Sequence, residues 1–431
     1  MTTYGQGRRV AIVAGARTPF AKAGSSLRFL SALELGKHAV IELIQRTAVD
    51  PNEVDLLIFG TVIPSVLAPN IAREVALMPL LPKRIDSYSV SRACASANQA
   101  ITNAADQIVL GHADVAIAGG AESLSTVPIL HSRGFADALI AASRAKSLGL
   151  RLGALSKLRP RDFVPVTPAL AERTTGESMG QSAEKMAKLN HIPRDEQDQL
   201  ALASHQRAAA GLADGRLTAE IAPVYIGPRY EEVLAADNGV RNDSSIAQLA
   251  ALKPVFDRRY GTVTAGNASP LTDGGAAVLL MREEKAKSLG YEPLAYIRSY
   301  AYAGLDPGEQ LLQAPVLAAP IALQRAGLTL GDMDLVEMHE AFAAQVLSNL
   351  RGFESQYWAE RAGVSHPVGT VDRAKLNVLG GSIAIGHPFG ATGARITTTL
   401  ANELKRRNGQ FGLMTVCAAG GLGFAMVLER A

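Results

Sequence analysis

Four side chains in this sequence have the chemistry of nucleophilic catalysis. Cys94 and Cys417 are the only two cysteines among the 431 residues. His339 follows an apolar run, and His387 lies between a glycine and a proline. A thiol beside an imidazole can lose its proton and attack a carbonyl carbon, because the thiolate is the nucleophilic form of cysteine. If the fold brings these four side chains together, covalent acyl chemistry becomes possible.

Cys94 stands where a strand is expected to give way to a helix. The alternating run 86–90 predicts a short strand, and apolar residues at helical spacing over 101–109 predict a helix that ends at Gly111. Free backbone N–H groups and the positive helix end converge there, so we expect the thiol to ionise easily. The alternative is that Cys94 is a small buried core residue, as most free cysteines are.

The other candidates also lie in segments that suit a binding site. Residues 377–395 are rich in glycine, which lets the backbone approach a ligand closely. Residues 415–423 predict a strand, a tight glycine turn and a returning strand. Each segment alone has an ordinary explanation as a turn or as core. Two cysteines and two histidines at equivalent strand ends together indicate one shared cleft.

The order of apolar runs predicts an α/β fold. Near-continuous apolar runs alternate with segments of helical spacing, which implies a mostly parallel sheet with helices on its faces. The expected strands are 10–14, 54–60, 86–90, 114–120, 274–281, 294–302, 334–339 and 411–417, and the expected helices are 32–46, 70–77 and 283–289.

The pattern occurs twice. The run 334–339 corresponds to 55–60, and 411–417 corresponds to 114–120. We therefore predict duplicated βαβαβ halves in a layered α/β/α/β/α arrangement, with one sheet per half. The expected domains are an N-terminal half over 1–121 and 253–293, an inserted loop domain over 122–252, and a C-terminal half over 294–431.

The segment 131–165 of the insertion is basic and amphipathic. Apolar residues fall on one helical face, and basic residues outnumber acidic ones. It is either a solvated helix on the protein's own core or a surface for anionic membrane, acyl chains or a partner subunit. Its charged residues are Arg133, Arg144, Lys146, Arg151, Lys157, Arg159 and Arg161, against Asp137 and Asp162.

The composition excludes several classes of protein. The net charge of +3 and the aromatic content of 5% argue against nucleic-acid binding. No signal-peptide core follows the first residues and no apolar run reaches membrane-spanning length, so we expect a cytoplasmic protein with reduced thiols. Two cysteines without histidines at ligand spacing predict no metal site.

Along its whole length the sequence resembles the thiolase family. The motifs that carry the resemblance begin at Cys94, Gly119, Thr264, His339 and Gly386, and the last is the Cys-Ala-Ala-Gly-Gly-Leu-Gly ending. Most thiolases have Asn before Glu-Ala-Phe and a Gly three residues after the nucleophile. Here His339 and Ala97 replace them, which resembles the thiolase (β) subunits of trifunctional fatty-acid β-oxidation complexes and their bacterial counterparts.

The resemblance implies a 3-ketoacyl-CoA thiolase, an acetyl-CoA C-acyltransferase. It implies Cys94 as the nucleophile that carries the acyl group, His387 as its base and Cys417 as the general acid and base. It also implies one oxyanion site made by His387 and a water or group that His339 positions, and a second made by the backbone N–H groups of Cys94 and Ala419. Coenzyme A is the implied co-substrate, and no permanently bound cofactor is expected.

Three further residues complete the implied site. Glu340 is either a carboxylate that orients its neighbours or an acid at a helix start. Ser269 and Asn267 are expected along the pantetheine of coenzyme A, and basic residues of the insertion near its phosphates.

The implied partners are 3-ketoacyl-CoA, a second copy of the chain in a homodimer or larger oligomer, and a hydratase/dehydrogenase α-subunit. The rival functions are a short-chain acetoacetyl-CoA thiolase working in condensation and a non-catalytic lipid or CoA carrier.

Overall fold

The computed structural model describes residues 4, 5, 7–165 and 171–431. Within them, ten strands form one large mixed sheet, and two short strands form a separate hairpin. The strands of the first half are β1 (Val10–Arg17), β2 (Ala21–Lys22), β3 (Leu56–Gly60), β4 (Asp86–Val90), β5 (Val115–Glu122) and β8 (Thr272–Arg282). Those of the second half are β9 (Ala295–Gly304), β10 (Leu335–Met338), β11 (Phe411–Ala418) and β12 (Leu422–Arg430).

The strand order makes the duplication visible. The first half runs β1-β8-β5-β3-β4 and the second runs β9-β12-β11-β10. A single parallel bridge from Val336 to Leu376 stands beside β10, where the first half has β4. The α/β class with duplicated halves is therefore confirmed. The expectation of one sheet per half was wrong, because the strands of both halves belong to a single sheet. The two sets of strands join through a short antiparallel pairing of β1 with β9, at Ala11–Tyr296 and Ile12–Ala295.

The expectation of a mostly parallel sheet was wrong. Only the pairs β3·β4, β3·β5 and β10·β11 are parallel. Strand β8 arrives from the insertion and enters antiparallel between β1 and β5. Strand β12 returns directly from β11 through Gly420 and Gly421, both of which adopt positive φ, and a hairpin this tight forces antiparallel pairing.

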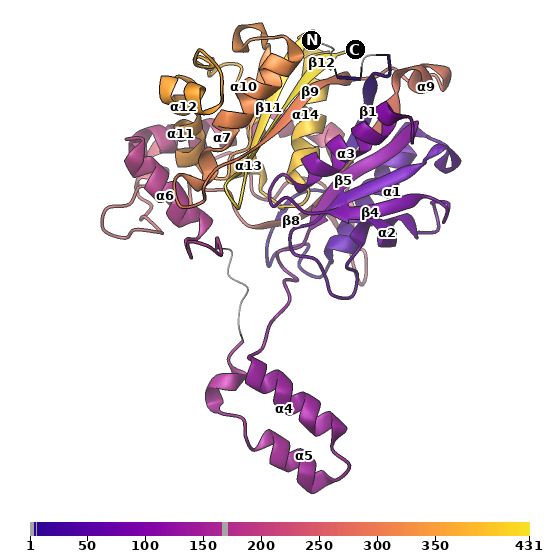
Figure 1. Ribbon diagram of the computed structural model, residues 1–431, viewed down its shortest axis with the longest axis vertical. Helices are drawn as coiled ribbons and strands as arrows, with labels where there is room; N and C mark the ends of the chain where they lie inside the picture. Colours follow the sequence, from indigo (N-terminus) through magenta and orange to yellow (C-terminus); the bar gives the residue numbers. More distant parts are fainter. Residues whose placement is uncertain (1–3, 6, 166–170) are drawn as a thin grey trace.

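Helices form three layers around the two halves of the sheet (Figure 1). Side chains alternate along each strand, so Leu56 and Ile58 pack in the central core while Leu57 and Phe59 pack in the outer core. The central layer is α3 (Ser96–Leu110) and α14 (Thr392–Arg407). The outer layers are α1 (Ala32–Thr47) and α2 (Ile71–Ala76) on the first half, and α10 (Pro315–Ala326), α11 (Ala343–Phe353) and α12 (Gln356–Arg361) on the second.

The inserted segment has two parts, one that packs on the body of the protein and one that projects from it. One part rests on the body, where a buried ion pair joins Arg17 of β1 to Asp237 at 2.6 Å. Its elements are α6 (Met179–Leu189), α7 (Arg194–Ala213), α8 (Ile246–Ala250) and the short strands β6 (Val224–Ile226) and β7 (Glu232–Leu234). Residues 166–170 lie outside the described residues. The domain boundaries stay a prediction.

The other part is a helical hairpin that projects from the body (Figure 1). Helices α4 (Arg133–Arg144) and α5 (Leu148–Leu155) pack on each other and on the 3-10 turn Pro160–Phe163. Helix α5 has no buried residue, and Ala138 is the buried residue of α4. The idea that this segment rests on the protein's own core was therefore wrong. In the described chain, no helix is long and apolar enough to cross a membrane.

Candidate active site

The fold brings a thiol and two imidazoles together from distant parts of the chain. Cys94 lies just before α3, His339 follows β10, and His387 lies between α13 (Ser382–Ile385) and α14. The Cys94 Sγ atom and one ring nitrogen from each histidine all lie within 4.8 Å of one another. The two imidazole rings are stacked at a tilt, with their centroids 4.1 Å apart.

Burial keeps the Cys94 thiol protonated. It raises the pKa of Cys94 to about 12, although the backbone N–H groups of Ala419 and of Cys94 itself lower it. The expectation that the helix start makes this thiol ionise easily was therefore wrong, because desolvation outweighs the helix end here. In this state Cys94 needs a base to remove its proton before it can act as a nucleophile.

The hydrogen bonds of His387 define which ring nitrogen can serve as that base. Thr392 donates its hydroxyl hydrogen to the carbonyl of Pro388, with an O–O distance of 3.1 Å. With its hydrogen given to Pro388, the same hydroxyl oxygen, 2.7 Å from His387 Nδ1, accepts a hydrogen bond from that nitrogen. The proton is therefore on Nδ1 and the lone pair is on Nε2. Burial lowers the pKa of His387 to about 3, which keeps the ring neutral.

The hydrogen bonds of His339 give the opposite tautomer. Arg395 Nη2 donates to the hydroxyl of Ser382 at 3.1 Å. Ser382 Oγ lies 3.0 Å from His339 Nδ1, which is the acceptor left for its hydrogen among the described residues. His339 therefore carries its proton on Nε2. Burial, His387 and Arg395 hold the pKa of His339 well below its ordinary value.

The two imidazoles thus offer complementary groups to one pocket. His387 Nε2 is an acceptor and His339 Nε2–H is a donor. Both Nε2 atoms are buried and have no hydrogen-bond partner within the described part of the protein. A buried polar atom without a partner costs stability, so two of them side by side indicate a place for a ligand.

Cys417 is the second thiol of the site. It lies in β11 and is 1% exposed, whereas Cys94 is partly exposed. Burial and the nearby Cys94 raise the pKa of Cys417 well above its ordinary value. Cys417 is therefore a neutral thiol beside Cys94, a state suited to donating a proton.

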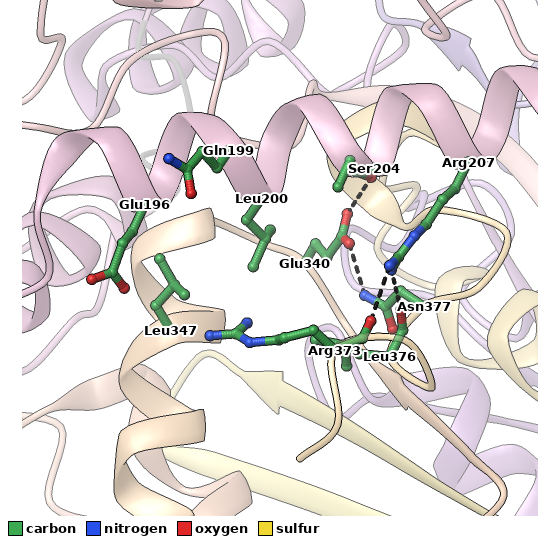
Figure 2. A pocket seen from close by; sticks show the side chains of 11 residues that line it. Glu196, Gln199, Leu200, Ser204, Arg207, Glu340, Leu347, Arg373, Leu376 and Asn377 are labelled. Atoms are coloured by element: carbon green, nitrogen blue, oxygen red, sulfur yellow. Dashed lines mark hydrogen bonds between the residues drawn. The ribbon is translucent and has the colours of Figure 1, made fainter. Parts of the chain in front are cut away.

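Glu340 holds the segment that carries Ser382 in place through hydrogen bonds. Figure 2 shows its carboxylate between Ser204 and Asn377, which donate to it at 2.7 Å each. The backbone N–H of Ile383 donates to it as well, at 3.2 Å. Helix α11 begins later, at Ala343, so the alternative of a helix-start acid was wrong. The cavity of about 360 Å³ in Figure 2 has Glu340 in its wall and does not include Cys94 or either active-site histidine.

A buried carboxylate, Glu122, holds the two halves together at the site. It ends β5 and accepts hydrogen bonds from the backbone N–H groups of Val62, Ile63 and Gly390. A Cβ atom on Gly120 would lie 2.0 Å from the carbonyl oxygen of Gly390, so this close approach requires glycine.

Sequence reasoning quoted Glu122 only as part of a motif and gave no role to Ser382, Thr392 or Arg395. A carboxylate two residues after a pair of glycines, at the end of a predicted strand, was the available signal for Glu122. The roles of the other three follow from hydrogen-bond directions, which sequence spacing does not reveal.

The residues expected along coenzyme A differ in accessibility. Asn267 is fully buried, and its amide donates to Asp198 at 3.0 Å and to the carbonyl of Thr262 at 3.1 Å. These hydrogen bonds hold the side chain within its own turn, and the contact of Asn267 with coenzyme A stays a prediction. Ser269 is partly exposed, and its place along coenzyme A stays a prediction.

Comparisons with known proteins agree with this architecture. The family profile "Thiolase, N-terminal domain" matches residues 10–284, and "Thiolase, C-terminal domain" matches residues 291–430. The 3-ketoacyl-CoA thiolase of Aeromonas salmonicida is 53% identical over 428 residues, covering 99% of this chain and 98% of that protein. The 3-ketoacyl-CoA thiolase of Colwellia psychrerythraea is 52% identical over the same length and with the same coverage.

Solved structures are similar over nearly the whole chain. The acetyl-CoA acetyltransferase of Bacillus anthracis superposes with a TM-score of 0.85 at 35% identity, covering 98% of this chain and 99% of that one. Human mitochondrial 3-ketoacyl-CoA thiolase in complex with CoA superposes with a TM-score of 0.82 at 33% identity, covering 98% of each chain.

The tautomers can be read from protein labelled with ¹⁵N-histidine. We expect His387 to be protonated on Nδ1 and His339 on Nε2 at pH 7. Neither ring should titrate between pH 8 and pH 5, because a lowered pKa keeps the neutral form down to more acidic pH. Ser382→Ala should change the tautomer of His339 only, and Thr392→Val that of His387 only.

Unfolding the protein in urea gives the control, since both rings should then titrate near their ordinary pKa of about 6.5. A midpoint near this value for either ring of the folded protein, or His339 protonated on Nδ1, would contradict the assignment.

Proposed function

The chain belongs to the thiolase family, and from this premise we propose that it is a 3-ketoacyl-CoA thiolase of fatty acid β-oxidation. Such an acyltransferase cleaves 3-ketoacyl-CoA with coenzyme A to acetyl-CoA and an acyl-CoA shortened by two carbons. The observation that carries the proposal is the cluster of Cys94, His339 and His387, with Cys417 adjoining it.

The first step forms the acyl-enzyme. Cys94 Sγ attacks the 3-keto carbon while His387 Nε2 takes the thiol proton, since that nitrogen has a free lone pair. The C2–C3 bond then breaks, and its electron pair passes to C2 and onto the thioester oxygen. The acyl group stays on Cys94 as a thioester.

Charge on the thioester oxygen needs hydrogen-bond donors. His339 Nε2–H is buried and has no partner among the described residues, and the protonated His387 becomes a second donor after it has taken the thiol proton. Removing one such donor costs about 10²–10³ in rate in other enzymes. Cys417 then protonates C2, which releases acetyl-CoA.

Coenzyme A completes the turnover. Its thiol passes a proton to the Cys417 thiolate and attacks the acyl group on Cys94. The backbone N–H groups of Cys94 and Ala419 are the donors proposed for the acyl oxygen. The departing Cys94 sulfur takes its proton back from His387. Every group thereby returns to its starting state, as ping-pong kinetics require.

Separating the two half-reactions tests the roles of the cysteines. Cys94→Ala should abolish both turnover and the acyl adduct that mass spectrometry detects after addition of an acyl-CoA. Cys417→Ser should still form that adduct but lose cleavage of 3-ketoacyl-CoA by about 10²-fold or more, because general acid–base catalysis is worth about 10²–10⁴.

Normal thiolysis by Cys417→Ser would remove this residue from the proposed mechanism. Wild-type protein that stays unmodified after substrate is added would favour the non-catalytic carrier.

The rival function is a short-chain acetoacetyl-CoA thiolase, which the similarity to the acetyl-CoA acetyltransferase of Bacillus anthracis favours. The curated relatives named 3-ketoacyl-CoA thiolase are more similar in sequence, at 52–53% identity. We therefore expect kcat/KM to be higher for 3-ketohexadecanoyl-CoA than for acetoacetyl-CoA, because each buried methylene contributes about 0.8 kcal/mol. The reverse order in a direct comparison of the two substrates would favour the rival.

The hairpin of α4 and α5 is proposed as a docking surface for anionic lipid. Leu148, Leu152 and Leu155 lie on one side of α5 and are 72%, 59% and 37% exposed, so the hairpin presents an apolar face to solvent. Seven basic residues against two acidic ones stand in the same segment, 131–165. Apolar burial together with attraction to anionic headgroups is the usual way that such a helix binds a membrane surface.

Co-sedimentation with phosphatidylglycerol vesicles tests this docking surface. We expect binding at low salt that weakens at high salt, where screening is stronger. Arg144→Gln with Lys146→Gln should weaken binding by about tenfold or more, since each surface charge contributes about 1 kcal/mol. The matched control, Arg144→Lys with Arg151→Lys, should bind as the wild type does. Wild-type protein that does not bind at low salt contradicts the proposal.

The family resemblance supports a homodimer or larger oligomer and a hydratase/dehydrogenase α-subunit as partner. The proposed location is the cytoplasm. Purification of the protein from its native source, followed by identification of the proteins that accompany it, tests the assembly.

A further inference from the structure

The thiol and two imidazoles of the active site have the donor atoms of a transition-metal site. Thiolate sulfur and imidazole nitrogen are the ligands that Zn²⁺ prefers, and catalytic zinc sites use three protein ligands with an open fourth position. Cys94, His339 and His387 supply these donor atoms within 4.8 Å of one another. We propose that this triplet binds Zn²⁺ and similar thiophilic divalent cations, and that the bound metal blocks the nucleophile.

To bind a metal ion, the three donor atoms need to move only slightly closer together. Zn–S bonds of about 2.3 Å and Zn–N bonds of about 2.0–2.1 Å place tetrahedral ligand atoms roughly 3.3–3.6 Å apart. Atoms within 4.8 Å reach this spacing by small side-chain rotations. Because Cys94 is partly exposed, it gives the ion a way in.

The ring nitrogens that would face the metal have no competing partner. His339 Nε2 and His387 Nε2 are buried and make no hydrogen bond to any described residue. Their Nδ1 atoms lie 3.0 Å from Ser382 Oγ and 2.7 Å from Thr392 Oγ1. A hydroxyl on the far nitrogen orients each ring in the way that outer partners orient histidine ligands in metal sites.

Metal binding involves proton movement and no change of oxidation state. The Zn–S bond forms as the S–H bond of Cys94 breaks, and the proton leaves to water. His387 uses the lone pair already on Nε2. His339 must move its proton from Nε2 to Nδ1, with the Ser382 hydroxyl turning to accept it. One proton is released for each ion bound.

His339 distinguishes this site from that of a thiolase with asparagine at the same position. With asparagine there, only one thiolate and one imidazole would remain as ligands for Zn²⁺, because an amide oxygen suits harder ions. The buried guanidinium of Arg395 repels any cation nearby, and its closest carboxylate oxygen, on Glu337, is 3.8 Å away. Only ions that bond strongly to sulfur offset this repulsion, so we expect Mg²⁺ and Ca²⁺ to be excluded.

Cobalt is the spectroscopic probe for the ligand set. We expect Co²⁺ added to the metal-free, full-length, reduced protein to give a thiolate-to-cobalt charge-transfer band that Zn²⁺ abolishes by displacing the cobalt. Cys94→Ser should lose the band. His339→Asn should weaken Co²⁺ binding by about tenfold or more, since loss of an outer partner alone costs 10–100-fold in metal sites. Thermal unfolding of each variant establishes that it is folded.

Matched controls come from the other cysteine and from an exposed histidine. Cys417→Ser and His191→Asn should bind Co²⁺ as the wild type does, because neither residue belongs to the triplet. A band that survives in Cys94→Ser, a band that disappears in Cys417→Ser, or displacement of Co²⁺ by Mg²⁺ would overturn the proposal. The absorption spectrum needs no turnover, so its outcome is independent of the proposed thiolase activity.

Discussion

Desolvation of two neighbouring imidazoles is the constraint on which this site depends. Burial beside the guanidinium of Arg395 keeps His339 and His387 neutral, so neither ring can act as a permanent cation. What each ring does is then decided by one hydroxyl. Thr392 accepts the hydrogen of His387 Nδ1, which leaves a lone pair on Nε2. Ser382 donates to His339 Nδ1, which leaves the hydrogen on Nε2. Two chemically identical side chains thereby take opposite roles in one pocket.

The fold holds this pair in place with buried carboxylates that do not react. Glu122, at the end of β5, accepts hydrogen bonds from the loop at Val62 and Ile63 and from Gly390 of the glycine-rich segment 377–395. Glu340 ties α7 to the segment that carries Ser382. Glu122 thereby holds loops from opposite halves of the chain together, and Glu340 holds the insertion against the second half.

Much of this could be predicted from the sequence, because periodicity and motifs report local structure. The duplicated α/β halves follow from the repeated apolar runs, and strand–helix junctions mark Cys94 and His339. Strand direction could not be predicted, since β8 reaches its place only after a long insertion. The protonated state of Cys94 was mispredicted and the internal hydrogen bonds of Asn267 were not anticipated, because both depend on how completely tertiary packing removes water. Tautomers depend on hydroxyl geometry, which no spacing rule encodes.

The central layer of α3 and α14 has a consequence for how the chain acquires its structure. Both helices are buried in the core between the two halves. The direct strand pairing between the two halves of the sheet is short and involves only β1 and β9. Each half alone would expose an apolar inner face, so the duplicated units cannot be autonomous folding modules. Their contacts join residues hundreds of positions apart, and a topology with such high contact order folds slowly and as one cooperative whole.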